Sequence, residues 1–190
     1  MPKANELNQL LATPKPPELG PGPRVGVQSE AALDRTLELC SLQGQATGYN
    51  QELVRALILL WHDHLEAAHA IAQSVESADA AFVHGIMHRR EPDYDNARYW
   101  FRRVGTHPAF MEIARRVSTM PGIQGQNQLL GQLLPQGKWD PFGFIAACET
   151  AAERPASDSA TRFLGEVQRI ETEALLWWLC GAAEASKMAA

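Results

Sequence analysis

Histidines, arginines and aromatic residues are concentrated in one short segment, residues 81–108 (AFVHGIMHRREPDYDNARYWFRRVGTHP). It holds three of the six histidines of the chain and five arginines. His84 and His88 are four residues apart, so a helix would place both imidazoles on one face. Two such imidazoles could bind a divalent metal ion or exchange a proton. The alternative is a pair of core histidines bonded to the backbone, to carboxylates or to Tyr94.

A second group of candidate metal ligands precedes this segment. Glu66 and His69 have the Glu-x-x-His spacing of di-iron helix bundles, and His64 is close to them. Such bundles need a second Glu-x-x-His element, which this chain does not have. The hypothesis is therefore a mixed site, in which His84 and His88 are joined by His64 or His69 and by Glu66. The alternative is that Glu66 and His69 belong to a solvated polar helix face.

Two adjacent arginine pairs, Arg89-Arg90 and Arg102-Arg103, suggest a different chemistry. Members of a pair project about 100° apart on a helix, so at most one of each can face a shared pocket. Guanidinium groups bind carboxylates and phosphates through paired hydrogen bonds. We therefore expect a surface for a peptide, a protein or a small anionic ligand, lined by Arg89, Arg90, Tyr99, Trp100 and Arg103. The alternative is a set of salt bridges to Glu91, Asp93, Asp95 and Glu112.

The pattern of apolar residues that must position these groups is helical, and strand-like alternation is essentially absent. Ser77 and Asp93 are suited to begin helices over 77–90 and 94–104, which Pro92 and Gly105 are suited to end. A turn at 61–63 is expected, with Asp63 and Glu66 as a capping box; the alternative is one continuous helix over 50–75. The other helices are expected at 5–11, 29–42, 50–60, 64–75, 108–118, 127–134, 141–153 and 159–186.

An internal repeat links the two histidine-bearing regions. Residues 62–73 (HDHLEAAHAIAQ) and 92–103 (PDYDNARYWFRR) align without gaps, thirty residues apart. The second unit resembles a tetratricopeptide repeat: Gly85, Ala97 and Phe101 match that family's small and aromatic positions, and Pro108 comes one residue early. His84 and His88 stand where the family has leucine and tyrosine packed between helices. Over about residues 50–108 this resemblance implies stacked antiparallel helix hairpins and a binding role.

The same segment is also similar to one in uncharacterised bacterial and fungal proteins, which implies no activity.

Residues 13–27 contain five prolines and three glycines, so residues 1–27 are expected to form an extended N-terminal arm. Residues 28–190 are then expected to form a single all-α domain. On the apolar last helix, at least one of Trp177 and Trp178 is expected in the core. The other could mark a homo-oligomer interface, and the alternative is that the Pro-rich arm covers it.

Bulk properties exclude several classes of protein. The 190-residue chain is 45% hydrophobic and 21% charged, which is typical of a globular domain. Its net charge of −5 argues against general nucleic-acid or membrane-surface binding. No apolar run approaches the roughly 20 residues of a membrane span. The three cysteines, Cys40, Cys148 and Cys180, are far apart, which indicates reduced thiols and a cytoplasmic location.

Two functional hypotheses follow from these residues. The first is a helical-repeat scaffold, without catalytic activity, that binds a peptide, a protein or a small anionic ligand. The second is a metal-dependent hydrolase or oxidase in which His84 and His88 bind a divalent metal. A third, structural hypothesis is a homo-oligomer formed through the last helix. Motifs of nucleotide-binding proteins and of serine or zinc hydrolases (GxGxxG, P-loop, GxSxG, HExxH) are missing from the chain.

Overall fold

The computed structural model describes residues 9–39, 48–121 and 125–181, and within them all regular structure is helical. This confirms the all-α prediction. The turn predicted at 61–63 is also confirmed, because α3 ends at Trp61 and α4 begins at Leu65. The helices are α2 (Glu30–Leu39), α3 (Gly48–Trp61), α4 (Leu65–Gln73), α5 (Ala78–Arg90), α6 (Tyr94–Val104), α7 (Ala109–Ser118), α8 (Asn127–Leu133), α9 (Pro141–Ala151) and α10 (Ser159–Leu179), with a 3-10 turn at Pro135–Gly137.

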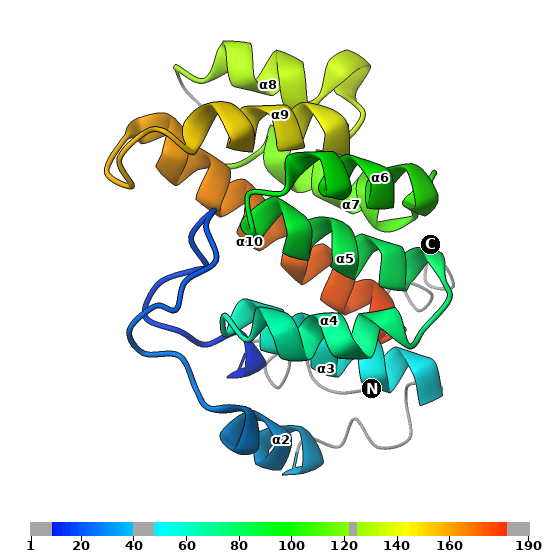
Figure 1. Cartoon of the computed structure of the whole chain (residues 1–190). Coiled ribbons are helices and arrows are strands. Elements are labelled where there is room, and N and C mark those ends of the chain that lie inside the picture. Colours follow the sequence, from blue (N-terminus) through cyan, green and yellow to red (C-terminus); the bar gives the residue numbers. More distant parts are fainter. Residues whose placement is uncertain (1–8, 40–47, 122–124, 182–190) are drawn as a thin grey trace.

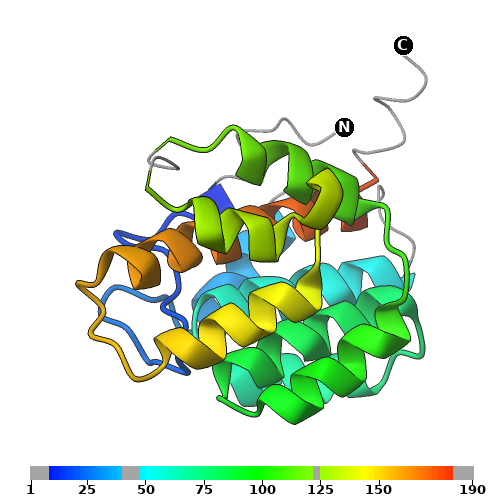
Figure 2. The same cartoon turned by 90° about the horizontal axis from the view of Figure 1, so that it is seen from above.

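Consecutive helices lie against one another in layers. Figure 1 shows α3 and α4, then α5, α6, α9 and α8 following one another across the molecule, with α10 running behind α5. The long helix α10 contacts α3, α7 and α9, and the view from above in Figure 2 shows it passing beneath α7 and α8. One continuous hydrophobic core therefore joins the early and late helices.

Polar caps fix the ends of the two helices that carry most candidate residues. The Ser77 side chain accepts a hydrogen bond from the Ala80 amide, and the Asp93 carboxylate accepts one from the Asn96 amide. Gly105, at φ 62°, terminates α6. The predicted boundaries of both helices are thus confirmed.

The turn between α3 and α4 differs from the prediction in one respect. His64, not Asp63, is the residue that precedes α4, and no side chain caps this helix. Asp63 adopts a positive φ of 66° and turns its carboxylate toward two arginines instead. The predicted capping box of Asp63 and Glu66 is therefore wrong.

Close packing of α6 on α5 depends on small residues. Ala97 is fully buried, and a Cβ atom added at Gly85 would lie 2.5 Å from the ring of Phe101. Gly85 thus makes room for Phe101, whose ring packs edge-on against Phe82. This approach holds α6 against the face of α5 that carries His84.

Residues 11–29 contain no helix and run along the α3–α4 turn and α10 (Figure 1, blue). His62 accepts a hydrogen bond from the Gln28 amide at Nδ1 and lies 3.2 Å from the Leu10 carbonyl at Nε2. The Gln168 side chain donates to the carbonyls of Pro17 and Glu18 at 3.1 and 2.9 Å. This segment is therefore bonded near both ends to His62 of the α3–α4 turn and near its middle to α10.

Candidate functional site

Arg89 lies in the protein interior, paired with a carboxylate from α10. Its guanidinium donates to both oxygens of Glu171, at 3.1 and 2.5 Å, and stands 4.2 Å from the centroid of Phe144. Both side chains are fully buried. Burial raises the pKa of Glu171 above its usual value, although the guanidinium of Arg89 acts in the opposite direction. Such a two-pronged pair fixes α5 against α10.

Arg90 is buried as well and points to the α3–α4 turn. It donates to the Asp63 carboxylate at 2.6 Å, to the Leu60 carbonyl and to the Gly20 carbonyl at 3.2 Å. The other oxygen of Asp63 accepts from the backbone and side chain of Arg24, at 2.8 and 2.9 Å. Burial alone would raise the pKa of Asp63, but these hydrogen bonds hold it below its usual value.

These contacts make Arg89 and Arg90 unavailable to a ligand, because both guanidinium groups are buried and paired. Neither guanidinium is exposed, and neither forms the salt bridges to Glu91, Asp93, Asp95 or Glu112 that were the alternative in the sequence. Their partners, Glu171 and Asp63, come from other helices or turns. Arg89 and Arg90 therefore do not belong to a ligand surface with Tyr99, Trp100 and Arg103.

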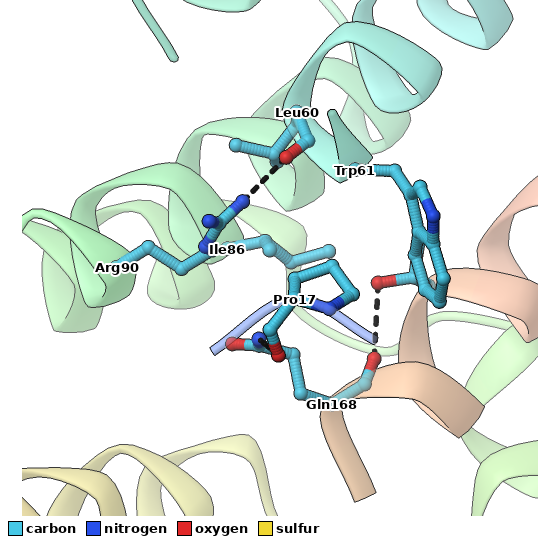
Figure 3. Close-up of a pocket in the computed structure, with 7 residues that line it drawn as sticks. Pro17, Leu60, Trp61, Ile86, Arg90 and Gln168 are labelled. Carbon is cyan, nitrogen blue, oxygen red and sulfur yellow. Dashed lines mark hydrogen bonds between the residues drawn. The ribbon is translucent and has the colours of Figure 1, made fainter. Parts of the chain in front are cut away.

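A small hollow beside Arg90 is part of this packing. It lies between Pro17, α3, α5 and α10 (Figure 3). It is too narrow to hold a water molecule. Hydrogen bonds from Arg90 to Leu60 and from Gln168 to Pro17 occupy the polar atoms around it. We therefore interpret it as a packing gap between the N-terminal segment and the helices, not as a ligand-binding pocket.

Three histidines from two helices meet on the other side of α5. The ring of His69, from α4, lies 5.2 Å from that of His84 and 5.6 Å from that of His88, measured between centroids. The His84 and His88 rings are 6.3 Å apart and nearly parallel. Their spacing of four residues places both on one face of α5, and His69 comes from the adjacent helix. We call these three residues the histidine cluster.

The protonation of His84 follows from its one hydrogen bond. Nδ1 lies 3.0 Å from the carbonyl oxygen of Ala80, which can only accept, so Nδ1 carries the proton. Nε2 is buried and has no hydrogen-bond partner among the residues that the structure describes. Burial lowers the pKa of His84 to about 4, so the ring is neutral at pH 7 and Nε2 presents a bare lone pair.

His88 has a polar neighbour at each ring nitrogen, whereas His84 has one at Nδ1 alone among the described residues. Its Nδ1 lies 3.2 Å from a carboxylate oxygen of Glu91, and the Asn96 amide nitrogen lies 3.2 Å from its Nε2. Burial lowers the pKa of His88, while the charges of Glu91 and Asp93 act in the opposite direction. His69 is half-buried, and within the described residues it makes ring contacts but no hydrogen bond or ion pair.

The aromatic residues of α6 cover this cluster and reach the surface. The indole of Trp100 stacks on the ring of His84 at 3.9 Å, with 8° between the planes. Tyr99 is exposed and meets Trp100 edge-on. The guanidinium of Arg103 stands 5.6 Å from the Trp100 ring centre and 5.9 Å from that of Tyr99. Tyr99, Trp100 and Arg103 are thus in contact with one another.

Two of the candidate metal ligands make no hydrogen bond or ring contact with the histidine cluster among the described residues. His64 bonds through Nε2 to the Gln28 carbonyl at 2.7 Å, and Glu66 is exposed on α4. In the described ranges, no three His, Cys, Asp or Glu side chains are already arranged around one metal position. The arrangement brings His69, His84 and His88 together and leaves His64 and Glu66 out.

A fourth histidine has a structural role. His107 lies 2.7 Å from Asp79 through Nε2, and its Nδ1 accepts from the Ala109 amide. Trp178 donates to the same Asp79 oxygen at 2.9 Å. Both nitrogens of His107 are therefore occupied, and Nε2 ties the α6–α7 loop to Asp79 of α5, which Trp178 of α10 also binds. Trp177, its neighbour in the sequence, is 44% exposed.

Sequence reasoning missed the residues that hold the arginines. Glu171 could have been found, because it lies in the apolar stripe of α10 with Val167 and Leu175, where a lone carboxylate indicates a buried partner. Asp63 had no comparable signal in the sequence, since its partner Arg24 is 39 residues away.

The thiols of Cys148 and Cys180 are buried, which raises the pKa of each to about 12 and keeps them protonated at neutral pH.

Comparisons with known proteins add no family. No protein-family model, no curated protein and no solved structure matches this chain. The likeness to tetratricopeptide repeats therefore stays a resemblance. Within the ranges described, no helix has the length and apolar character needed to cross a bilayer.

Proposed function

We propose that this protein is a non-catalytic helical binding protein, related in architecture to tetratricopeptide-like hairpins, and that its ligand is an acidic peptide segment. The ligand surface consists of Tyr99, Trp100 and Arg103 on α6. An acidic side chain or a terminal carboxylate of the peptide pairs with Arg103, and its neighbouring side chains pack on the two rings.

One observation carries this proposal: Arg103 stands over two aromatic rings and has no carboxylate partner in the part of the chain that the structure describes. Five nearby arginines differ, because each pairs with an acidic side chain: Arg89, Arg90, Arg98, Arg115 and Arg116. Arg102 is exposed and also lacks a carboxylate partner among the described residues, but there it stands over no aromatic ring. An unpaired guanidinium beside the exposed ring of Tyr99 and the half-buried ring of Trp100 supports capture of a carboxylate from outside, since arginine and aromatic residues are the usual anchors of interfaces.

The test is a selection followed by a matched comparison. Peptides are selected from a random display library on the wild-type protein, and their affinities are then measured on Arg103→Gln and on Arg115→Gln. Arg115 is exposed and, among the described residues, its guanidinium pairs with Glu112 of the preceding turn, so it controls for the loss of a surface arginine.

We expect acidic peptides to be selected, and Arg103→Gln to weaken them by about tenfold or more, as charged hydrogen bonds contribute about 1.5–3 kcal/mol. Arg115→Gln should bind like the wild type. Selection of peptides without acidic residues, or equal binding by Arg103→Gln, would contradict the proposal.

A metal-dependent enzyme is the second candidate function. The bare and buried Nε2 of His84 beside two further imidazoles favours it. A homo-oligomer has less support, because stable interfaces bury about 1,200–2,000 Å² and Trp177 alone supplies a small part of that area.

A further inference from the structure

We infer that the histidine cluster, His69, His84 and His88, binds a divalent transition-metal ion of the zinc class between α4 and α5. The inference does not rest on the proposed acidic-peptide surface, because its ligands are imidazoles and not Arg103, although Trp100 of that surface stacks on His84. It is also independent of whether the bound metal takes part in a reaction.

The first support is the unsatisfied nitrogen of His84. A buried acceptor without a donor costs roughly 1–3 kcal/mol, and a metal ion is a natural partner for it. The hydrogen bond from Nδ1 to the Ala80 carbonyl leaves Nε2 as the free nitrogen. Metal-binding histidines are commonly held in this way, with one ring nitrogen on a backbone carbonyl and the other on the metal.

The second support is the environment of His88. The Glu91 carboxylate lies 3.2 Å from Nδ1, which is the carboxylate–histidine arrangement that orients metal-binding imidazoles. Nε2 is then the nitrogen available to a metal. It now faces the Asn96 amide at 3.2 Å, so Asn96 must move aside when the metal binds.

The third support is the spacing of the rings. Zinc–nitrogen bonds of about 2.0–2.1 Å place imidazole centres around a tetrahedral ion about 5 Å apart. The His69–His84 and His69–His88 separations, 5.2 and 5.6 Å, are close to that value. The His84–His88 separation of 6.3 Å must shorten by about 1 Å.

Side-chain rotation can provide the remaining change. As noted, no three ligating side chains of the described residues already surround one position, so the rings must turn toward a common point. His69 is free to do so, because no hydrogen bond within the described part holds its ring. Three imidazoles then leave one position of a tetrahedral ion for water, and imidazole ligands suit zinc, copper and nickel.

The experiment uses the full chain without a histidine tag, freed of metal with a chelator. Co²⁺ is titrated as a spectroscopic probe of tetrahedral coordination, and Zn²⁺ is titrated in competition with a chromophoric chelator. His69→Ala is the main variant, because it removes a ligand at the cost of ring contacts alone. His64→Gln is the control, since His64 lies outside the cluster and glutamine can donate to the Gln28 carbonyl in its place.

We expect one Zn²⁺ per chain, visible absorption of tetrahedral Co²⁺, and at least about tenfold weaker Zn²⁺ binding in His69→Ala. Zn²⁺ should raise the melting temperature of the wild type but not of His69→Ala. The metal-free forms of both should melt alike, which separates ligand loss from misfolding. Absence of micromolar Zn²⁺ binding to the wild type, equal binding by His69→Ala, or equal weakening in His64→Gln would overturn the inference.

Discussion

Neighbouring arginines of the segment 81–108 have different roles because their guanidinium groups differ in burial. Arg89 and Arg90 are within 1% of full burial and each faces a carboxylate, whereas Arg103 lies on the surface over two rings. A buried guanidinium must be paired, while an exposed one is free to meet a ligand. Their residue types were readable from the sequence, but their roles were not, because Asp63 and Glu171 lie far from them along the chain.

At the same scale, His62 should make the stability of the protein depend on pH. Burial lowers its pKa below 6.5, and Arg24 and His64 act in the same direction, whereas the Leu10 carbonyl and Asp63 oppose them. The folded protein therefore binds fewer protons than the unfolded chain just below pH 6.5, so the free energy of unfolding falls as the solution is acidified.

We expect this fall to be less steep in His62→Asn than in the wild type, measured by urea denaturation of metal-free protein between about pH 7 and pH 5. The asparagine oxygen can still accept from the Gln28 amide but does not titrate. His84 contributes to the slope in both proteins, so the difference isolates His62. Equal slopes would mean that His62 is not held neutral by the fold.

At the scale of the helices, prediction from the sequence succeeded where the signals were local. Ser77, Asp93 and Gly105 cap or end α5 and α6 as expected, because a cap acts on the amides of its own turn. Asp63 is predicted as a cap from its local sequence alone. Its carboxylate instead binds Arg24 and Arg90, which are distant in the sequence. The meeting of His69 with His84 is one of two alternatives in the sequence, and only the packing of α4 on α5 decides between His69 and His64.

The contact between α5 and α6 should depend on Gly85. Because an added Cβ would lie 2.5 Å from the Phe101 ring, Gly85→Ala should overpack this contact and lower the free energy of unfolding by about 1–3 kcal/mol. Gly165 is a matched control, as it is helical and has no atom within 4 Å of an added Cβ. Gly165→Ala should be neutral or stabilising by up to about 1 kcal/mol. Urea denaturation of both variants measures the difference, and a Gly85→Ala protein as stable as the wild type would rule out close packing there.

At the scale of the whole molecule, buried charges join parts that are distant in the sequence. Asp63 binds Arg24 of the N-terminal segment and Arg90 of α5, while Arg89 and Gln168 connect α5 and that segment to α10. The site on α4, α5 and α6 therefore rests on a frame that includes residues 11–29 (Figure 1).

Asp63→Asn should accordingly destabilise the whole protein by about 3–5 kcal/mol, because it leaves two guanidinium groups without a counter-charge in the interior. Asp34→Asn is the control: its pair with Arg55 is exposed, at 40% and 37% of the side chains, and should contribute less than about 1 kcal/mol. Calorimetric melting compares the two, and limited proteolysis should show cleavage within residues 11–29 in Asp63→Asn first. Similar melting of the two variants would show that the buried bridge does not hold the frame together.

The most direct test of acidic-peptide binding is a double-mutant cycle between Arg103 and the acidic residue of a selected peptide. Affinities are measured for wild type and Arg103→Gln, each with the peptide and with its acid-to-amide variant. We expect the two changes to be coupled by about 1–3 kcal/mol, because each removes the same ion pair. Additive effects, with coupling near zero, would show that Arg103 does not meet the carboxylate and would contradict the proposed function.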